Sequence, residues 1–153
     1  DGRKPRERAT EGAVILTMLT ESQRATLRAL IDRIIPADDF PGGWEAGVGG
    51  YLDRQFAGDL CHQLDMYRAG LDAFDIEARA TAGVNFAELA PDAQDALLRK
   101  VELGDVVTDW PIEPAVFFHA AAEHAAEGFY GDPGNGGNRD GVSWRMIGFE
   151  VTG

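Results

Sequence analysis

The sequence predicts an all-α protein, an irregular helical bundle of about five helices followed by an ordered loop rich in glycine and aromatic residues. Three observations predict it. Apolar residues recur at helical spacing in several segments, short links containing proline or glycine separate these segments, and no stretch alternates apolar and polar residues for the length of a strand. The chain has 153 residues and is 44% hydrophobic, which is enough to bury one core.

The first predicted helix begins at a capping box and ends before a proline. Thr20 and Gln23 have the spacing at which a threonine cap and a glutamine side chain satisfy each other's backbone amides. Pro36 ends the helix, and a turn-rich link follows over 37–43. The apolar positions at helical spacing are Leu27, Leu30, Ile31 and Ile34.

A weaker helix is predicted over 44–57, where glycines interrupt an apolar face. Asp59 is expected to cap the longest helix, which continues to about Thr81 and stops at Gly83. Cys61 within it is expected to be a small buried hydrophobic side chain. The apolar stripe of this helix, in steps of four and three, consists of Leu60, Leu64, Tyr67, Leu71 and Phe74.

Two further helices are predicted towards the C-terminus. Pro91 suits the first position of a helix that Gly104 follows. Glu113 or Pro114 then opens a helix that continues to about Glu127. Phe86 and Leu89 lie in the connection before these helices, and the expected buried faces are formed by Leu97, Leu98, Val101, Phe117, Phe118, Ala121, Ala122 and Ala125.

Two regions are expected in the chain: an N-terminal arm over 1–18 and a single helical domain over 19–153. The net charge is -12, although the arm begins with four basic residues. Because a helical domain this acidic repels phosphate backbones, we expect no nucleic-acid partner. No apolar run approaches the length of a transmembrane helix. The single cysteine excludes an intramolecular disulfide and a cluster site of four cysteines.

Few residues suggest catalysis, and we expect neither a catalytic centre nor a bound metal or cofactor in this chain. His119 and Glu123 are four residues apart, so they can share a helix face. An alternative is therefore a free-standing helical metal-binding protein or enzyme that uses His119, Glu123 and a distant ligand. The same two residues are equally explained as ordinary polar positions on the surface of a helix, without any metal.

The segment 128–149 combines seven glycines with four large aromatic residues. Glycine at this density suits tight turns, and large aromatic side chains favour burial, so an ordered loop held by aromatic anchors is expected. Asp132, Arg139 and Asp140 are expected to support it by charge-assisted hydrogen bonds. The segment resembles a dinucleotide fingerprint only loosely and lacks the spacing of an EF-hand calcium loop.

Two strings resemble a known family. EGFYGDPGNGGNRDGVSWRMIGF, at 127–149, looks very like the C-terminal signature of the gluconate 2-dehydrogenase subunit 3 family. LTESQRATLRALIDRIIPADDFPG, at 19–42, is similar to the first helix of that family and the link after it. With the helical middle, the resemblance covers 19–149.

The resemblance implies a non-catalytic small subunit beside a large FAD-dependent dehydrogenase of the glucose–methanol–choline type. Such complexes oxidise CH–OH groups of sugars, sugar acids or glycosides, and many include a cytochrome c subunit. FAD belongs to the partner. The resemblance also implies that the small subunit helps the large one to mature or to be exported by a twin-arginine signal. A periplasmic location follows, with membrane association through partners.

The segment 128–149 is the predicted contact with that partner. Aromatic residues and arginine are the side chains that most often dominate binding at protein interfaces. Asn135, Asn138 and Asp140 are also candidates for contact with substrate. The predicted partner-binding residues are Phe129, Tyr130, Asp132, Asn135, Asn138, Arg139, Asp140 and Trp144.

Overall fold

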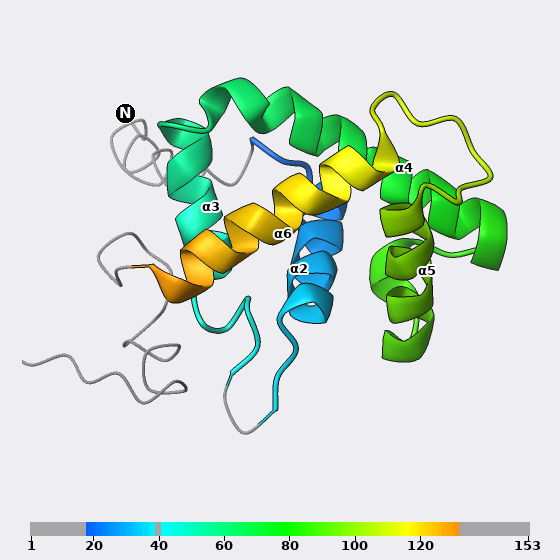
Figure 1. Ribbon diagram of the computed structural model, residues 1–153, viewed down its shortest axis with the longest axis horizontal. Coiled ribbons are helices and arrows are strands. Elements are labelled where there is room, and N and C mark those ends of the chain that lie inside the picture. Colours follow the sequence, from blue (N-terminus) through cyan, green and yellow to red (C-terminus); the bar gives the residue numbers. More distant parts are fainter. Residues whose placement is uncertain (1–17, 39–40, 132–153) are drawn as a thin grey trace, which may run out of the picture.

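The computed structural model describes residues 18–38 and 41–131, and the regular structure in this part of the chain is all helical, with no strand. Five α-helices and two short 3-10 helices connect through turns and links, which confirms the predicted fold class (Figure 1). In chain order they are α2 (Glu21–Ile34), α3 (Val48–Ala57), η1 (Cys61–Gln63), α4 (Leu64–Ala82), η2 (Phe86–Glu88), α5 (Pro91–Leu103) and α6 (Pro114–Tyr130).

The last described helix, α6, organises the bundle. It contacts α2, α3, α4 and α5, and Figure 1 shows it crossing the molecule diagonally. Helix α2 packs in turn against α4, α5 and η2. The helices cross at varied angles rather than lying parallel, so the bundle is irregular (Figure 1).

Aromatic rings join the helices at the centre of the core. Tyr67 of α4 lies between Phe56 of α3 and Phe117 of α6, with ring centroids 4.8 and 5.5 Å apart. Phe74, two turns further along α4, contacts Phe86 of η2 at 5.3 Å. All five side chains are at most 1% exposed. Edge-to-face packing at these distances stabilises a core beyond the area that the rings bury.

The start of α2 confirms the predicted capping box. The Gln23 amide donates to Thr20 Oγ1 at 3.0 Å, and the Thr20 amide donates to Gln23 Oε1 at 2.9 Å. Each side chain therefore satisfies a backbone donor that the helix leaves unpaired.

Replacing Thr20 by alanine is expected to lower the free energy of unfolding by about 1 kcal/mol, because the Gln23 amide loses its acceptor. Thr20→Ser retains an oxygen at the same place and should stay within about 0.5 kcal/mol of the wild type. Urea unfolding followed by circular dichroism measures both variants. Equal losses for the two would contradict a capping role.

Helix α3 begins later than predicted. Residues 44–47 form a turn, and the helix starts at Val48 rather than at Trp44. Gly47 explains the difference, since its φ of 103° is a left-handed conformation that continues no α-helix. The turn folds the Trp44 ring back onto Gly49, where a Cβ atom would lie 2.7 Å from the ring.

The start of the longest helix also differs from the prediction. Asp59 does not cap it: η1 precedes α4, and neither helix has a side-chain cap. Cys61 lies in η1 and is exposed, so the expected burial was wrong. In the 3-10 turn the Cys61 side chain faces a different direction from the one it would have in an α-helix. The predicted stop at Gly83 is confirmed, with a φ of 81°.

Helix α5 has the predicted start at Pro91 and the predicted stop at Gly104. Helix α6 starts at Pro114 as predicted but continues past Glu127 to Tyr130. Its fully buried positions are spaced by four residues, and Phe129 continues this series. Burial of that ring explains the extra turn, because helical geometry is what brings it to the core face. The series is Phe117, Ala121, Ala125 and Phe129.

One hydrophobic core runs through the described helices. The division into an arm over 1–18 and a domain over 19–153 stays a prediction, because 1–17 and 132–153 lie outside the described residues. Within the described ranges, no helix combines the length and the apolar character that crossing a membrane requires.

Candidate functional site

The last turn of α6 leads into the predicted recognition segment, and α3 fixes its position. A Cβ atom on Gly128 would lie 2.7 Å from Cδ2 of Tyr51, so the two helices approach closely here. The Tyr51 hydroxyl donates to Glu127 Oε2 at 3.2 Å. Burial and the neighbouring Glu127 carboxylate raise the pKa of Tyr51 to about 12, so the phenol remains a donor at neutral pH.

Two of the eight predicted partner-binding residues lie in the described part of the chain. Phe129 is fully buried in the core, so its ring holds the end of α6 in place from within. Tyr130 is 51% exposed, with its ring centroid 4.9 Å from that of Phe129. The other six lie outside the described residues: Asp132, Asn135, Asn138, Arg139, Asp140 and Trp144.

The alternative pair on α6 lies at the surface. His119 and Glu123 are both exposed. Over residues 18–38 and 41–131, no group of three or more His, Cys, Asp or Glu side chains is placed to hold a metal ion. Nothing in that part of the structure therefore supplies the further ligand that the metal-binding alternative requires.

The remaining histidine of α6 takes part in the core. His124 is 7% exposed, and its Nδ1 lies 2.7 Å from the hydroxyl of the fully buried Tyr67. The two rings also stack, with centroids 5.8 Å apart. Burial raises the pKa of Tyr67, which keeps its hydroxyl protonated. This hydrogen bond joins α4 to α6 and satisfies two buried polar groups.

Asp75 of α4 is a buried carboxylate that ties three elements together. The Thr26 hydroxyl of α2 lies 3.0 Å from both of its oxygens, and the Ser22 hydroxyl donates at 3.2 Å. The Phe86 amide at the start of η2 donates at 3.0 Å. Donors occupy both oxygens, so the group holds α2 and η2 on α4, and it also lines a hollow of about 390 Å³ between these elements.

Glu77, two residues after Asp75 on α4, holds the link between α5 and α6 in the same way. The amides of Val107 and Thr108 donate to it at 2.8 and 3.1 Å, and Trp110 Nε1 donates at 3.2 Å. The Thr108 hydroxyl donates as well. Burial alone raises the pKa of Glu77, but these hydrogen bonds outweigh it and bring the pKa below its usual 4.5. The carboxylate is a structural anchor.

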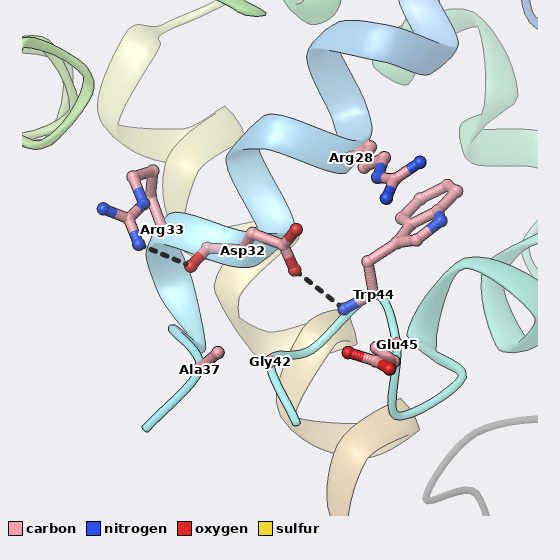
Figure 2. A pocket seen from close by; sticks show the side chains of 7 residues that line it. All are labelled: Arg28, Asp32, Arg33, Ala37, Gly42, Trp44 and Glu45. Atoms are coloured by element: carbon pink, nitrogen blue, oxygen red, sulfur yellow. Dashed lines mark hydrogen bonds between the residues drawn. The ribbon is translucent and has the colours of Figure 1, made fainter. Parts of the chain in front are cut away.

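A hollow of about 550 Å³ beside α2 was not anticipated from the sequence. Figure 2 shows it between the α2 side chains Arg28 and Asp32 and the turn that carries Trp44. Asp32 Oδ1 accepts the Trp44 amide hydrogen at 3.0 Å, which fixes the turn against the helix. The sequence feature that could have indicated this hollow is the i, i+4 spacing of the polar residues Arg28 and Asp32 on α2, on the face opposite its buried leucines.

The chain was compared with known proteins. A model of the family described as gluconate 2-dehydrogenase subunit 3 matches residues 21–152. The chain belongs to the gluconate 2-dehydrogenase subunit 3 family. Searches among curated proteins and among solved structures returned no match.

Membership of the gluconate 2-dehydrogenase subunit 3 family implies a small subunit of a dehydrogenase complex. The match extends from the first residue of α2 to 152, so it includes both the hollow beside α2 and the predicted recognition segment. The family match confirms the resemblance carried by 19–42 and 127–149.

Proposed function

We propose that this chain is the non-catalytic small subunit of a periplasmic, FAD-dependent dehydrogenase complex that oxidises CH–OH groups of sugars, sugar acids or glycosides. The large subunit, of the glucose–methanol–choline type, carries FAD, and a cytochrome c subunit accepts the electrons in complexes that contain one. The small subunit binds the large one and assists its maturation. The observation that carries the proposal is the family match over 21–152.

The arrangement of polar groups in the described helices supports a binding role over a catalytic one. Asp75 and Glu77 are saturated by donors, and His124 is paired with Tyr67. Each of these buried groups joins elements of the bundle to one another. A rigid bundle of this kind suits a scaffold that presents a surface to a partner.

The end of α6 is the best-placed start of that surface. Tyr130 is half exposed on a turn that Phe129 and Gly128 fix against the core. A rigid aromatic side chain on an ordered helix end is a favourable interface anchor, since little conformational entropy is lost when it binds. We propose that 130–149 continues from this point as the contact with the large subunit.

Purification of the tagged chain from its native host tests the proposed function. The expected result is a flavoprotein at near-equal stoichiometry, identified by mass spectrometry and by the absorbance of its flavin. Recovery of the chain alone, under conditions in which it is folded, would count against a subunit role.

Replacing Tyr130 and Trp144 together by alanine is expected to weaken association with that flavoprotein by roughly 30-fold or more, which is the range of interface hot spots. The conservative pair Tyr130→Phe and Trp144→Phe retains both aromatic rings and should bind much more tightly. Val116→Ala, an exposed apolar position at the other end of α6, is the matched control. Surface plasmon resonance measures the affinity of all three variants. An unchanged affinity of the alanine pair would show that the interface lies elsewhere on the chain.

A further inference from the structure

The last turn of α6 lacks the local features that end α4 and α5. Those two helices each stop at a glycine in the left-handed conformation, Gly83 and Gly104, with φ of 81° and 74°. Each also carries a basic residue in its last turn, Arg79 and Lys100. Gly131, which follows α6, has a φ of -76°, and the last turn of α6 contains no basic residue. Helix α6 therefore ends without two of the features that stabilise a helix C-terminus.

Two residues of this last turn make it less stable still. Glu127 places a negative charge at the negative end of the helix dipole, which disfavours the helical conformation there. Gly128 follows it, and glycine is among the weakest helix formers. The local sequence therefore opposes the last turn of α6, so contacts with the rest of the bundle must keep it helical.

Two side chains hold the last turn of α6 in the bundle. Phe129 anchors it from the core, where its ring is fully buried. Tyr51 of α3 holds it from the neighbouring helix, because its ring lies against the Gly128 backbone and its hydroxyl donates to Glu127 Oε2 at 3.2 Å. Among the described residues, Tyr51 is the one hydrogen-bond donor to the Glu127 side chain. The carboxylate that opposes the helix end is thus the group that ties this end to α3.

Helix α3 is itself fixed on both sides of Tyr51. Arg24 of α2 binds Asp53 through two bonds of 2.8 and 2.9 Å. The Trp44 ring packs against Gly49 near the start of α3. The Tyr51 side chain is buried as well, so its hydroxyl is a donor in a defined place rather than a mobile surface group.

We propose that Tyr51 is the positioning residue for the contact between the end of α6 and the large subunit. Its hydroxyl engages the Glu127 carboxylate, so a charge that would otherwise loosen the last turn ties that turn to α3. Tyr130, the exposed aromatic side chain at the end of the turn, is thereby held in place for its partner. The inference rests on the proposed function for the identity of that partner, whereas the order of the turn is a property of this chain alone.

The test compares full-length wild type with Tyr51→Phe, Glu127→Gln and the double variant. Tyr51→Phe retains the ring against Gly128 and removes only the hydroxyl, whereas Glu127→Gln retains an oxygen acceptor and removes the charge. Glu123→Gln, which removes an exposed carboxylate one turn earlier on α6, is the matched control. Amide hydrogen exchange followed by NMR measures the opening of 128–130, and its dependence on low concentrations of urea separates local opening from unfolding of the whole bundle.

We expect the amides of 128–130 to exchange by local opening, with little dependence on urea, and Tyr51→Phe to speed this exchange roughly threefold. The reason is that the Glu127 charge loses its donor and then only opposes the helix dipole. Glu123→Gln should exchange like the wild type. A Tyr51→Phe variant that exchanges at the wild-type rate overturns the proposal.

Glu127→Gln distinguishes positioning by the hydroxyl from a general loss of packing. With Tyr51 present it should change the exchange of 128–130 by less than about twofold, because an acceptor is retained while the repulsion is lost. In the Tyr51→Phe background it should return the exchange close to the wild-type rate, because the uncompensated charge is gone. Equal effects of Glu127→Gln in the two backgrounds overturn the proposal.

Affinity for the flavoprotein, measured by surface plasmon resonance, connects the turn to the contact. Tyr51→Phe should bind roughly twofold to threefold more weakly, because the partner must then order a turn that the hydroxyl no longer holds. The double variant should bind like the wild type. Faster exchange in Tyr51→Phe with unchanged affinity overturns the positioning role. If the wild-type chain recovers no flavoprotein, the proposed function fails, while the exchange rates still decide whether Tyr51 holds the turn.

Discussion

Replacing Glu77 by alanine is expected to lower the free energy of unfolding by about 3–4 kcal/mol. Glu77 is 1% exposed, and its carboxylate accepts hydrogen bonds from two backbone amides, one hydroxyl and one indole of the α5–α6 link. Truncation leaves these donors without an acceptor and opens a cavity beside Trp110, whose ring packs on Phe74 at 5.3 Å. For a domain whose whole stability is about 5–15 kcal/mol, this is a severe loss.

The pH dependence of that loss separates the charge of Glu77 from its packing. Hydrogen bonding holds the pKa of the folded carboxyl below its usual 4.5, so the unfolded chain binds the proton more readily. The stabilisation is therefore complete above pH 4.5 and disappears as the pH falls through the lower folded pKa. The difference in unfolding free energy between wild type and Glu77→Ala should shrink in that range.

Urea unfolding between pH 3 and pH 7 measures the effect. Glu77→Gln preserves the shape without the charge and should lose less stability at neutral pH than the alanine variant. Glu123→Ala removes an exposed carboxylate of α6 and should stay within about 0.5 kcal/mol of wild type. A difference for Glu77→Ala that is as large at pH 3 as at pH 7 would show that packing alone is responsible.

Substituting Gly70 by alanine is expected to destabilise the bundle by about 2 kcal/mol, although alanine is the better helix former. Gly70 lies in α4, and a Cβ atom there would be 2.4 to 2.6 Å from ring atoms of Phe117. The ring has little room to move, because Tyr67 and Phe74 contact it with centroids at 5.5 and 5.9 Å. The added methyl group therefore separates α4 from α6.

A double-mutant cycle identifies the cause. Phe117→Leu alone should be destabilising, because it removes the aromatic contacts of a fully buried ring. Combined with it, Gly70→Ala should cost less than in the wild type, since the ring that it meets is gone. Thermal unfolding of the four proteins gives the coupling. Additive losses would mean that the close approach of α4 to α6 does not cause the effect.

The two predictions describe how the bundle is held together. Phe117 is packed against the Gly70 backbone at the centre, and Glu77 anchors the α5–α6 link. The end of α6, on which the proposed contact with the large subunit depends, belongs to a helix that these interactions position.

The sequence predicted much of the fold because local signals agreed with burial. The Thr20 cap and the stops at Gly83 and Gly104 depend on a few neighbouring residues, and the structure has each of them. Predictions that assumed an unbroken helix were wrong at Asp59 and Cys61. There the chain passes through a 3-10 turn, whose residues face different directions from those of an α-helix.

By itself the sequence determined the helical class, most helix ends and the family likeness, because each is encoded in short patterns of residues. The tertiary structure alone decided which charged and aromatic side chains serve the core. Phe129, expected at an interface, is buried by the register of α6, while Glu77 and Asp75, ordinary acidic positions in the sequence, anchor distant segments. The hollow beside α2 likewise depends on the turn that places Trp44 beside Arg28, a proximity that no local pattern encodes.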